Sequence, residues 1–126
     1  MISIFKTIEE LTTAVADHFV TIAGNSISSR GEFNVVLSGG SSPKRLYEML
    51  ASSGFNHKVE WDKVNFFFGD ERYVPANDPE NNALMVKKAM FDPLNISSSN
   101  IFTVDTSLSP EDAARKYALT INDHFR

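Results

Sequence analysis

The stretch that most constrains the fold runs from Asn34 to Pro43 and reads Asn-Val-Val-Leu-Ser-Gly-Gly-Ser-Ser-Pro. Its first part is a short apolar run, typical of a strand that is covered on both faces. Its second part has almost no side-chain bulk and ends at a proline that can open a helix. Glycines let backbone N–H groups approach a ligand closely, and the N-terminus of a helix favours an anion. The stretch therefore predicts a phosphate- or carboxylate-accepting loop at the carboxyl end of a parallel strand.

Helical and strand patterns alternate along the rest of the chain. We expect strands over residues 33–37, 64–68 and 101–104, and helices over about 8–23, 43–53, 82–91 and from Pro110 to near the C-terminus. Thr7 and Glu10 form a capping box before the first helix, and the polar residues 24–31 are expected to form a loop after it. The alternation predicts a single α/β domain, residues 1–126, built around a mainly parallel sheet. Because three strands make a small sheet, we expect this chain to be the N-terminal part of a longer fold.

Composition narrows the class of protein. The chain has no cysteine, so disulfides and thiolate chemistry are excluded. No apolar run approaches the roughly 20 residues that span a bilayer, and the first residues lack the blocks of a signal peptide. We therefore expect a cytoplasmic protein. The net charge of -4 argues against a nucleic-acid surface, and no cluster of side chains has the spacing of metal ligands.

A second motif follows the next strand. Asp70, Glu71 and Arg72 come directly after an aromatic run, residues 66–68, and one glycine. The carboxyl ends of parallel strands meet at one edge of a sheet, where open α/β sheets bind ligands. Asp70 could orient a ligand or transfer a proton, and Arg72 could bind an anion. Taken alone, the first motif is more simply a tight turn and the second an exposed turn with a local ion pair, but their expected meeting at one edge favours a binding site.

Both motifs resemble those of the 6-phosphogluconolactonase family. The likeness covers essentially the whole chain and is carried by Leu37-Ser38-Gly39-Gly40-Ser41-Ser42-Pro43 with Leu46-Tyr47, by Phe68-Gly69-Asp70-Glu71-Arg72-Tyr73-Val74-Pro75, and by Asp78-Pro79-Glu80-Asn81-Asn82. The related glucosamine-6-phosphate deaminases share the glycine turn but typically carry Asp-Glu-Tyr where this chain has Asp-Glu-Arg. The sequence therefore resembles the lactonases more than the deaminases.

The resemblance implies hydrolysis of 6-phosphogluconolactone to 6-phosphogluconate in the pentose phosphate pathway, without a metal or an organic cofactor. It implies a Rossmann-like three-layer sandwich, of which this chain would be the N-terminal portion. By position, Arg72 is expected to face the phosphate, and Asp70 to lie by the sugar or orient the site. The other substrate-binding residues that the family implies are Ser38, Gly39, Gly40, Ser41 and Ser42.

The catalytic histidine of the family has no counterpart in this sequence. The resemblance implies a later Gly-x-Gly-x-Asp-Gly-His segment, whose histidine acts as general acid and base, and these residues do not include one. Attack of water on a lactone needs such a base and donors for the developing oxyanion. Asp70 could replace it only if deeply buried, and His57 and His124 are isolated and expected to be solvated. We therefore expect Asp70 to be auxiliary and the chain alone to be inactive or nearly so.

Two other functions stay open on the sequence alone. One is a sugar-phosphate isomerase or deaminase of the same fold, which the stretch Arg72 to Pro75 disfavours. The other is a non-catalytic module that binds a sugar phosphate, which the missing histidine segment keeps open. In each case the expected partner is a small sugar phosphate, with no nucleic acid and no membrane. Self-association through exposed apolar surface is also expected of half a domain.

Overall fold

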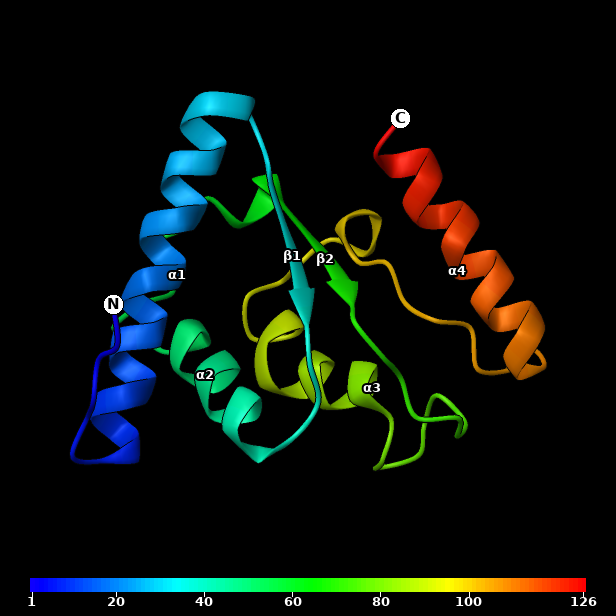
Figure 1. Cartoon of the computed structure of the whole chain (residues 1–126), viewed down its shortest axis with the longest axis horizontal. Coiled ribbons are helices and arrows are strands. Elements are labelled where there is room, and N and C mark those ends of the chain that lie inside the picture. The colour runs from blue at the N-terminus through cyan, green and yellow to red at the C-terminus, as the bar shows by residue number, and fades with distance from the viewer.

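The computed structural model describes residues 1–126 (Figure 1). Helices and the two strands alternate as far as α3, a π-helical segment continues α3, and α4 follows without a further strand. The elements are α1 (Ile8–Arg30), β1 (Phe33–Leu37), α2 (Ser41–Ala51), β2 (Val64–Phe68), α3 (Asn82–Val86), the π-helical segment Lys87–Phe91 and α4 (Pro110–His124). None of the helices combines the length and apolar character needed to cross a membrane.

The sheet consists of two parallel strands in the predicted positions. β1 pairs with β2 in a register that runs from Phe33 opposite Val64 to Leu37 opposite Phe68. The strands are joined through α2, which is the crossover that a parallel pair requires. The predicted strands 33–37 and 64–68 are therefore confirmed, and their carboxyl ends lie side by side.

The prediction of a third strand over 101–104 is wrong, because no strand forms there. Ile101 forms only an isolated parallel bridge with Phe66, and the Phe102 N–H donates to the Phe66 carbonyl at 2.9 Å. Beyond that point the hydroxyl of Tyr117, from α4, takes the place of a strand. It accepts from the Phe68 N–H at 2.6 Å and lies 3.1 Å from the Phe68 carbonyl and 3.3 Å from the Phe102 carbonyl. A side chain thus satisfies the backbone groups that strand pairing would have used.

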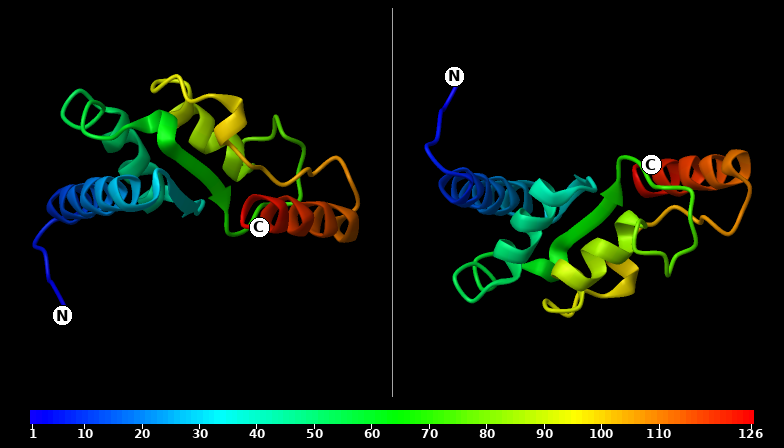
Figure 2. Two further views of the ribbon diagram at one scale, coloured as in Figure 1. Left: turned by 90° about the horizontal axis from the view of Figure 1, so that it is seen from above. Right: turned by 90° about the horizontal axis from the view of Figure 1, so that it is seen from below.

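Helices cover both faces of the sheet (Figure 2). On one face Phe66 is fully buried against α2 and the π-helical segment, where the Phe91 ring lies 5.0 Å away. On the other face the Phe67 ring stacks on Phe102 at 4.7 Å and meets His124, at the end of α4, at 5.1 Å. The chain therefore has the α/β architecture with three layers that the sequence predicts.

The first helix is longer than its pattern predicts. It ends at Arg30, and Gly31, with φ of 82°, forms the left-handed cap that was expected near Gly24. Ala23 and Ile27 are buried on either side of Gly24, so packing against the core keeps this stretch helical despite its polar composition. Residues 24–30 are thus helix and not loop.

The other helices differ from prediction only at their ends. α2 begins at Ser41 rather than at Pro43, and it ends before residue 53. The predicted helix over 82–91 is present, with a change to π-helical geometry at Lys87. The helix from Pro110 is confirmed, and the Ser109 hydroxyl caps it by accepting from the Asp112 N–H at 3.2 Å.

Candidate functional site

The two predicted loops leave neighbouring strands at the same edge of the sheet (Figure 1). Leu37 and Phe68 are opposite each other at the ends of β1 and β2. One residue further on, the Gly69 N–H donates to the Leu37 carbonyl at 3.1 Å. The glycine turn, Ser38–Gly40, and the acidic loop, Gly69–Arg72, therefore start within hydrogen-bonding distance of each other.

Among the four α-helices, only α2 starts without a side-chain cap. Thr7, Asn81 and Ser109 each cap their helix, whereas α2 starts from Gly40, with no side-chain hydrogen bond and no acidic residue in its first turn. The N–H groups of residues 39–42 make no hydrogen bond within the chain. Ser41 and Ser42 add two exposed hydroxyls. Unpaired N–H groups at a helix start can bind an anion.

Tyr47 fixes the beginning of the glycine turn. Its hydroxyl accepts from the Ser38 N–H at 2.9 Å and donates to the Ser38 carbonyl at 3.0 Å. Burial raises the pKa of the Tyr47 phenol above its usual value, and the hydrogen bond with Ser38 opposes this effect. The neutral phenol can therefore both donate and accept at ordinary pH, and it anchors the turn to α2.

Asn82, the first residue of α3, lies between the two loops. A Cβ atom on Gly39 would overlap the Asn82 Oδ1 atom, so the amide group packs directly on the glycine. The Nδ2 atom of the same side chain donates to the Asp70 carbonyl at 3.4 Å. Asn82 is only 7% exposed. The amide thus contacts the glycine turn on one side and the acidic loop on the other.

Glu71 ties the acidic loop to α3. Its Oε1 atom accepts from the N–H groups of Arg72 at 2.8 Å and Asn82 at 2.6 Å. Its Oε2 atom accepts from the Ala83 N–H at 3.0 Å. Both carboxylate oxygens are therefore engaged by backbone donors at the start of a helix, where a negative charge is favourable. On sequence alone Glu71 belongs to the second motif without a role of its own, because its contacts are with a helix start eleven and twelve residues further along the chain.

Asp70 and Arg72 are exposed, and their side chains make no hydrogen bond or ion pair within the chain. Both can therefore meet a ligand. Asp70 does not have the deep burial that would be needed for it to replace the missing histidine. Two more basic residues, Lys44 and Arg45, are exposed in the first half of α2.

The two loops border different cavities. Ser38 and Ser42 line one of about 370 Å³ that continues over apolar residues of α1. Glu71 and Tyr73 line another of about 360 Å³ against α4. The structure thus brings all the predicted residues to one edge and joins the loops through Asn82, but the two loops do not share either of these cavities. No group of three or more histidine, aspartate or glutamate side chains is placed so that it could hold a metal ion.

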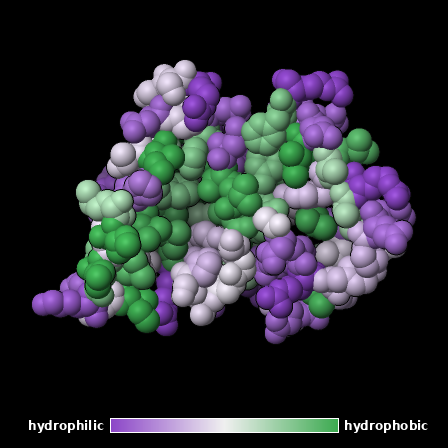
Figure 3. Space-filling model, viewed as in Figure 1, coloured by the Kyte–Doolittle hydropathy of each residue, from purple (hydrophilic) through white to green (hydrophobic).

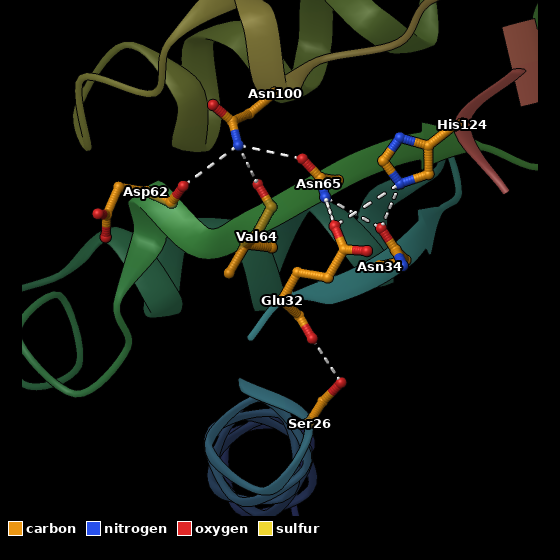
Figure 4. Close-up of polar contacts among 8 residues, drawn as sticks. All are labelled: Ser26, Glu32, Asn34, Asp62, Val64, Asn65, Asn100 and His124. Carbon is orange, nitrogen blue, oxygen red and sulfur yellow. Dashed lines mark hydrogen bonds and ion pairs between the residues drawn. The ribbon is translucent and has the colours of Figure 1, made fainter. Parts of the chain in front are cut away.

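The three histidines lie away from this edge. His18 is exposed on α1, and His57 is exposed in the connection between α2 and β2. His124, the last residue of α4, lies beside Asn34 and Glu32 near the start of β1 (Figure 4). Its Nε2 atom lies 2.9 Å from Asn34 Oδ1 and 3.8 Å from Glu32 Oε2. The expectation that His124 is solvated is therefore wrong, because its side chain is 17% exposed and is packed among aromatic rings.

Comparison with known proteins gives one consistent family. Residues 6–126 match the family described as glucosamine-6-phosphate isomerases/6-phosphogluconolactonase. A 6-phosphogluconolactonase of Nostoc sp. is 38% identical over 95% of this chain and 51% of its own length. The 6-phosphogluconolactonase of Haemophilus influenzae is 31% identical over 90% of this chain and 47% of its own length.

Solved structures show the same fold. The 6-phosphogluconolactonase of Thermotoga maritima matches 90% of this chain and 50% of its own with a TM-score of 0.83 and 33% identity. That of Trypanosoma brucei matches 97% of this chain and 48% of its own with a TM-score of 0.78 and 30% identity. The chain therefore spans about half the length of the relatives that it matches.

Proposed function

Because the chain belongs to the glucosamine-6-phosphate isomerase/6-phosphogluconolactonase family, we propose that it serves in the hydrolysis of 6-phosphogluconolactone to 6-phosphogluconate, a step of the pentose phosphate pathway. The similar proteins from Nostoc and Haemophilus influenzae carry the name of that lactonase. In this proposal the 126 residues supply the substrate-binding edge of the sheet.

The observation that carries the proposal is the uncapped N-terminus of α2 beside the acidic loop. Free N–H groups of residues 39–42, with the hydroxyls of Ser41 and Ser42, can surround one anionic group. The exposed guanidinium of Arg72 adds a bidentate donor for phosphate. Arg72, Lys44 and Arg45 give the local positive charge that a sugar phosphate needs on a chain of net charge -4.

The remaining predicted residues have supporting roles. Ser38, Gly39 and Gly40 form the floor against which the substrate lies, and Asp70 orients the sugar. Lactone hydrolysis also needs a base for the attacking water. Asp70 is exposed and the three histidines are elsewhere, so residues 1–126 bind the ligand in this proposal without turning it over at a substantial rate. Robust hydrolysis of the lactone by the purified chain would show that the base has been misassigned.

The alternatives make different demands on the ligand. A deaminase of the same fold would prefer an amino sugar phosphate, and Arg72 followed by Tyr73 speaks against it. A non-catalytic module would bind the sugar phosphate without converting it to a product. We propose in addition that the protein is cytoplasmic, uses no metal or organic cofactor, and binds neither nucleic acid nor membrane.

The proposal is tested by calorimetric titration of the chain with 6-phosphogluconate. We expect Arg72→Ala to weaken binding by about 1.5–3 kcal/mol, which is roughly 10- to 150-fold, because it removes a charge-assisted contact. Arg115→Ala is the matched control, since it removes the same charge from α4, where Arg115 pairs only with Asp112 at 2.8 Å.

The outcomes separate the functions. Equal affinity of the wild type and Arg72→Ala would remove Arg72 from the phosphate role. Tighter binding of glucosamine 6-phosphate than of 6-phosphogluconate would favour the deaminase. Absence of binding by either sugar phosphate would contradict the proposed site.

A further inference from the structure

We propose that Glu71 and Asn82 are positioning residues that hold the loop carrying Asp70 and Arg72 against the glycine turn. The contacts that place the two loops do not depend on the proposed function. Only the expected effect on ligand affinity rests on it. Neither side chain touches the ligand in this proposal. They act by fixing the relative placement of the two loops that do.

Glu71 supplies the first tie. Its carboxylate accepts from the backbone N–H of Arg72 and from those of Asn82 and Ala83, which follow Glu71 by eleven and twelve residues. The intervening residues 73–81 include Pro75 and Pro79 and form only local backbone hydrogen bonds. The side chain is therefore a direct link between the acidic loop and α3, and both of its oxygens are already engaged by backbone N–H groups.

Asn82 supplies the second tie. Its amide donates to the Asp70 carbonyl and packs so closely on Gly39 that a Cβ atom there would displace it. Since the Asn82 N–H is held by Glu71 at 2.6 Å, a shift of Glu71 would move Asn82 as well. The chain of contacts thus runs from Arg72 through Glu71 and Asn82 to Gly39.

A simple helix cap would explain only part of this arrangement. Asn81 already caps α3 through its Oδ1 atom, which accepts from the Leu84 N–H at 2.9 Å. Glu71 comes from a different segment, and its third partner, the Arg72 N–H, belongs to the loop itself. These contacts fix the loop relative to the helix, in addition to stabilising the helix start.

The test is an NMR study of the full chain in four variants. Glu71→Ala removes every contact of the carboxylate. Glu71→Gln keeps Oε1 as an acceptor for Arg72 and Asn82 but places an NH₂ group at Ala83. Asn82→Ala removes the contact with Gly39, and Glu80→Gln, at an exposed neighbouring position, is the charge-matched control. Circular dichroism checks that each variant is folded.

Two readouts, the amide shifts of the glycine turn and the affinity for the ligand, distinguish positioning from capping; hydrogen exchange reports the loss of the Glu71 bonds in either case. In Glu71→Ala we expect hydrogen exchange at Asn82 and Ala83 to quicken about tenfold or more, because charge-assisted bonds are lost. We also expect the amide shifts of Gly39 and Gly40 to move, although these glycines do not contact Glu71. Affinity for 6-phosphogluconate should fall about tenfold with Arg72 still present, and Glu71→Gln should lie between the wild type and Glu71→Ala.

The results bear on the two proposals separately. Faster exchange at Asn82 and Ala83, with unchanged glycine shifts and unchanged affinity, would reduce Glu71 to a cap and overturn the inference. If the wild type does not bind 6-phosphogluconate, the proposed function fails, while the glycine shifts still decide whether the loops are coupled. If Glu71→Ala does not fold, the same comparison is made with Glu71→Gln and Asn82→Ala.

Discussion

The two glycines at the end of β1 are needed for different physical reasons. Gly40 has φ of 107°, a conformation that side chains rarely adopt. Gly39 has no such backbone conformation, but the Asn82 amide occupies the space of its Cβ. The sequence predicts that both glycines belong to a turn. Only the structure shows that Gly39 must be a glycine because of its contact with Asn82, 43 positions later.

This difference predicts that Gly39 and Asn82 are energetically coupled. Gly39→Ala should reduce the free energy of unfolding by about 1–3 kcal/mol, because the added methyl overlaps the amide. The three atoms nearest to that methyl all belong to the Asn82 side chain beyond its Cβ. In an Asn82→Ala background the same substitution should therefore cost much less, as a double-mutant cycle by urea denaturation would measure.

Gly24 provides a control for that cycle. It lies within α1 with nothing within 4 Å of its Cβ position. Gly24→Ala should therefore stabilise the chain by about 0.5–1 kcal/mol in either background. Equal costs of Gly39→Ala with and without Asn82 would show that the glycine turn does not depend on this contact.

At the scale of elements, two tyrosines hold the ends of the two strands. Tyr47 from α2 binds both backbone groups of Ser38 after β1, and Tyr117 from α4 binds both of Phe68 at the end of β2. Burial raises the pKa of each phenol, while its backbone hydrogen bond opposes that shift. The carboxyl edge of the sheet is therefore fixed by hydroxyl groups where further strand pairing is missing.

Because the pKa values of Tyr47 and Tyr117 are raised in the folded chain, we expect the free energy of unfolding to decrease in alkaline solution. As the pH rises above about 10, the phenols of the unfolded chain lose their protons before those of the folded chain. Unfolding then releases protons, and its free energy falls with pH until the raised folded pKa values are passed. Tyr47→Phe and Tyr117→Phe should each make this fall shallower. At pH 7 each should cost about 1–2 kcal/mol, because hydrogen bonds to the backbone are lost.

Urea denaturation between pH 7 and pH 11 measures both effects. Tyr73→Phe is the control, since Tyr73 is 61% exposed and its hydroxyl makes no hydrogen bond within the chain. The double variant Tyr47→Phe/Tyr117→Phe should lose less stability between pH 7 and pH 11 than the wild type. An equally steep loss would contradict this account.

Hydrophobic periodicity and helix-end signals predict an element well where residues close in the sequence determine it. β1 and β2 read directly as apolar runs, and α4 follows from the Ser109 cap and Pro110. The errors have tertiary causes. Burial of Ala23 and Ile27 carries α1 past a polar stretch, and the Tyr117 hydroxyl replaces the third strand. The position of the loops follows from strand order, but Glu71 and Asn82 depend on side-chain contacts that no pattern reveals.

At the scale of the whole molecule, one apolar face is left uncovered. Val36 points away from the main core and is 65% exposed, while Ile8, Leu11 and Val15 of α1 are 57%, 46% and 40% exposed. These four residues line one cavity together, and Figure 3 shows the hydrophobic surface over α1 and towards the strands. β1 pairs only with β2, so its other edge is also free. We refer to these four residues as the open apolar face.

An open apolar face beside a free strand edge favours association, because both burial of apolar area and strand pairing become available to a second chain. We expect purified residues 1–126 to associate increasingly between micromolar and millimolar concentration, as sedimentation velocity would detect. Val36→Glu places a charge at the most exposed residue of the face and should shift the chain to the monomer. Thr13→Glu adds the same charge at an exposed polar position of α1 and should not. A monomer at all concentrations, or equal effects of the two charges, would show that this face does not mediate association.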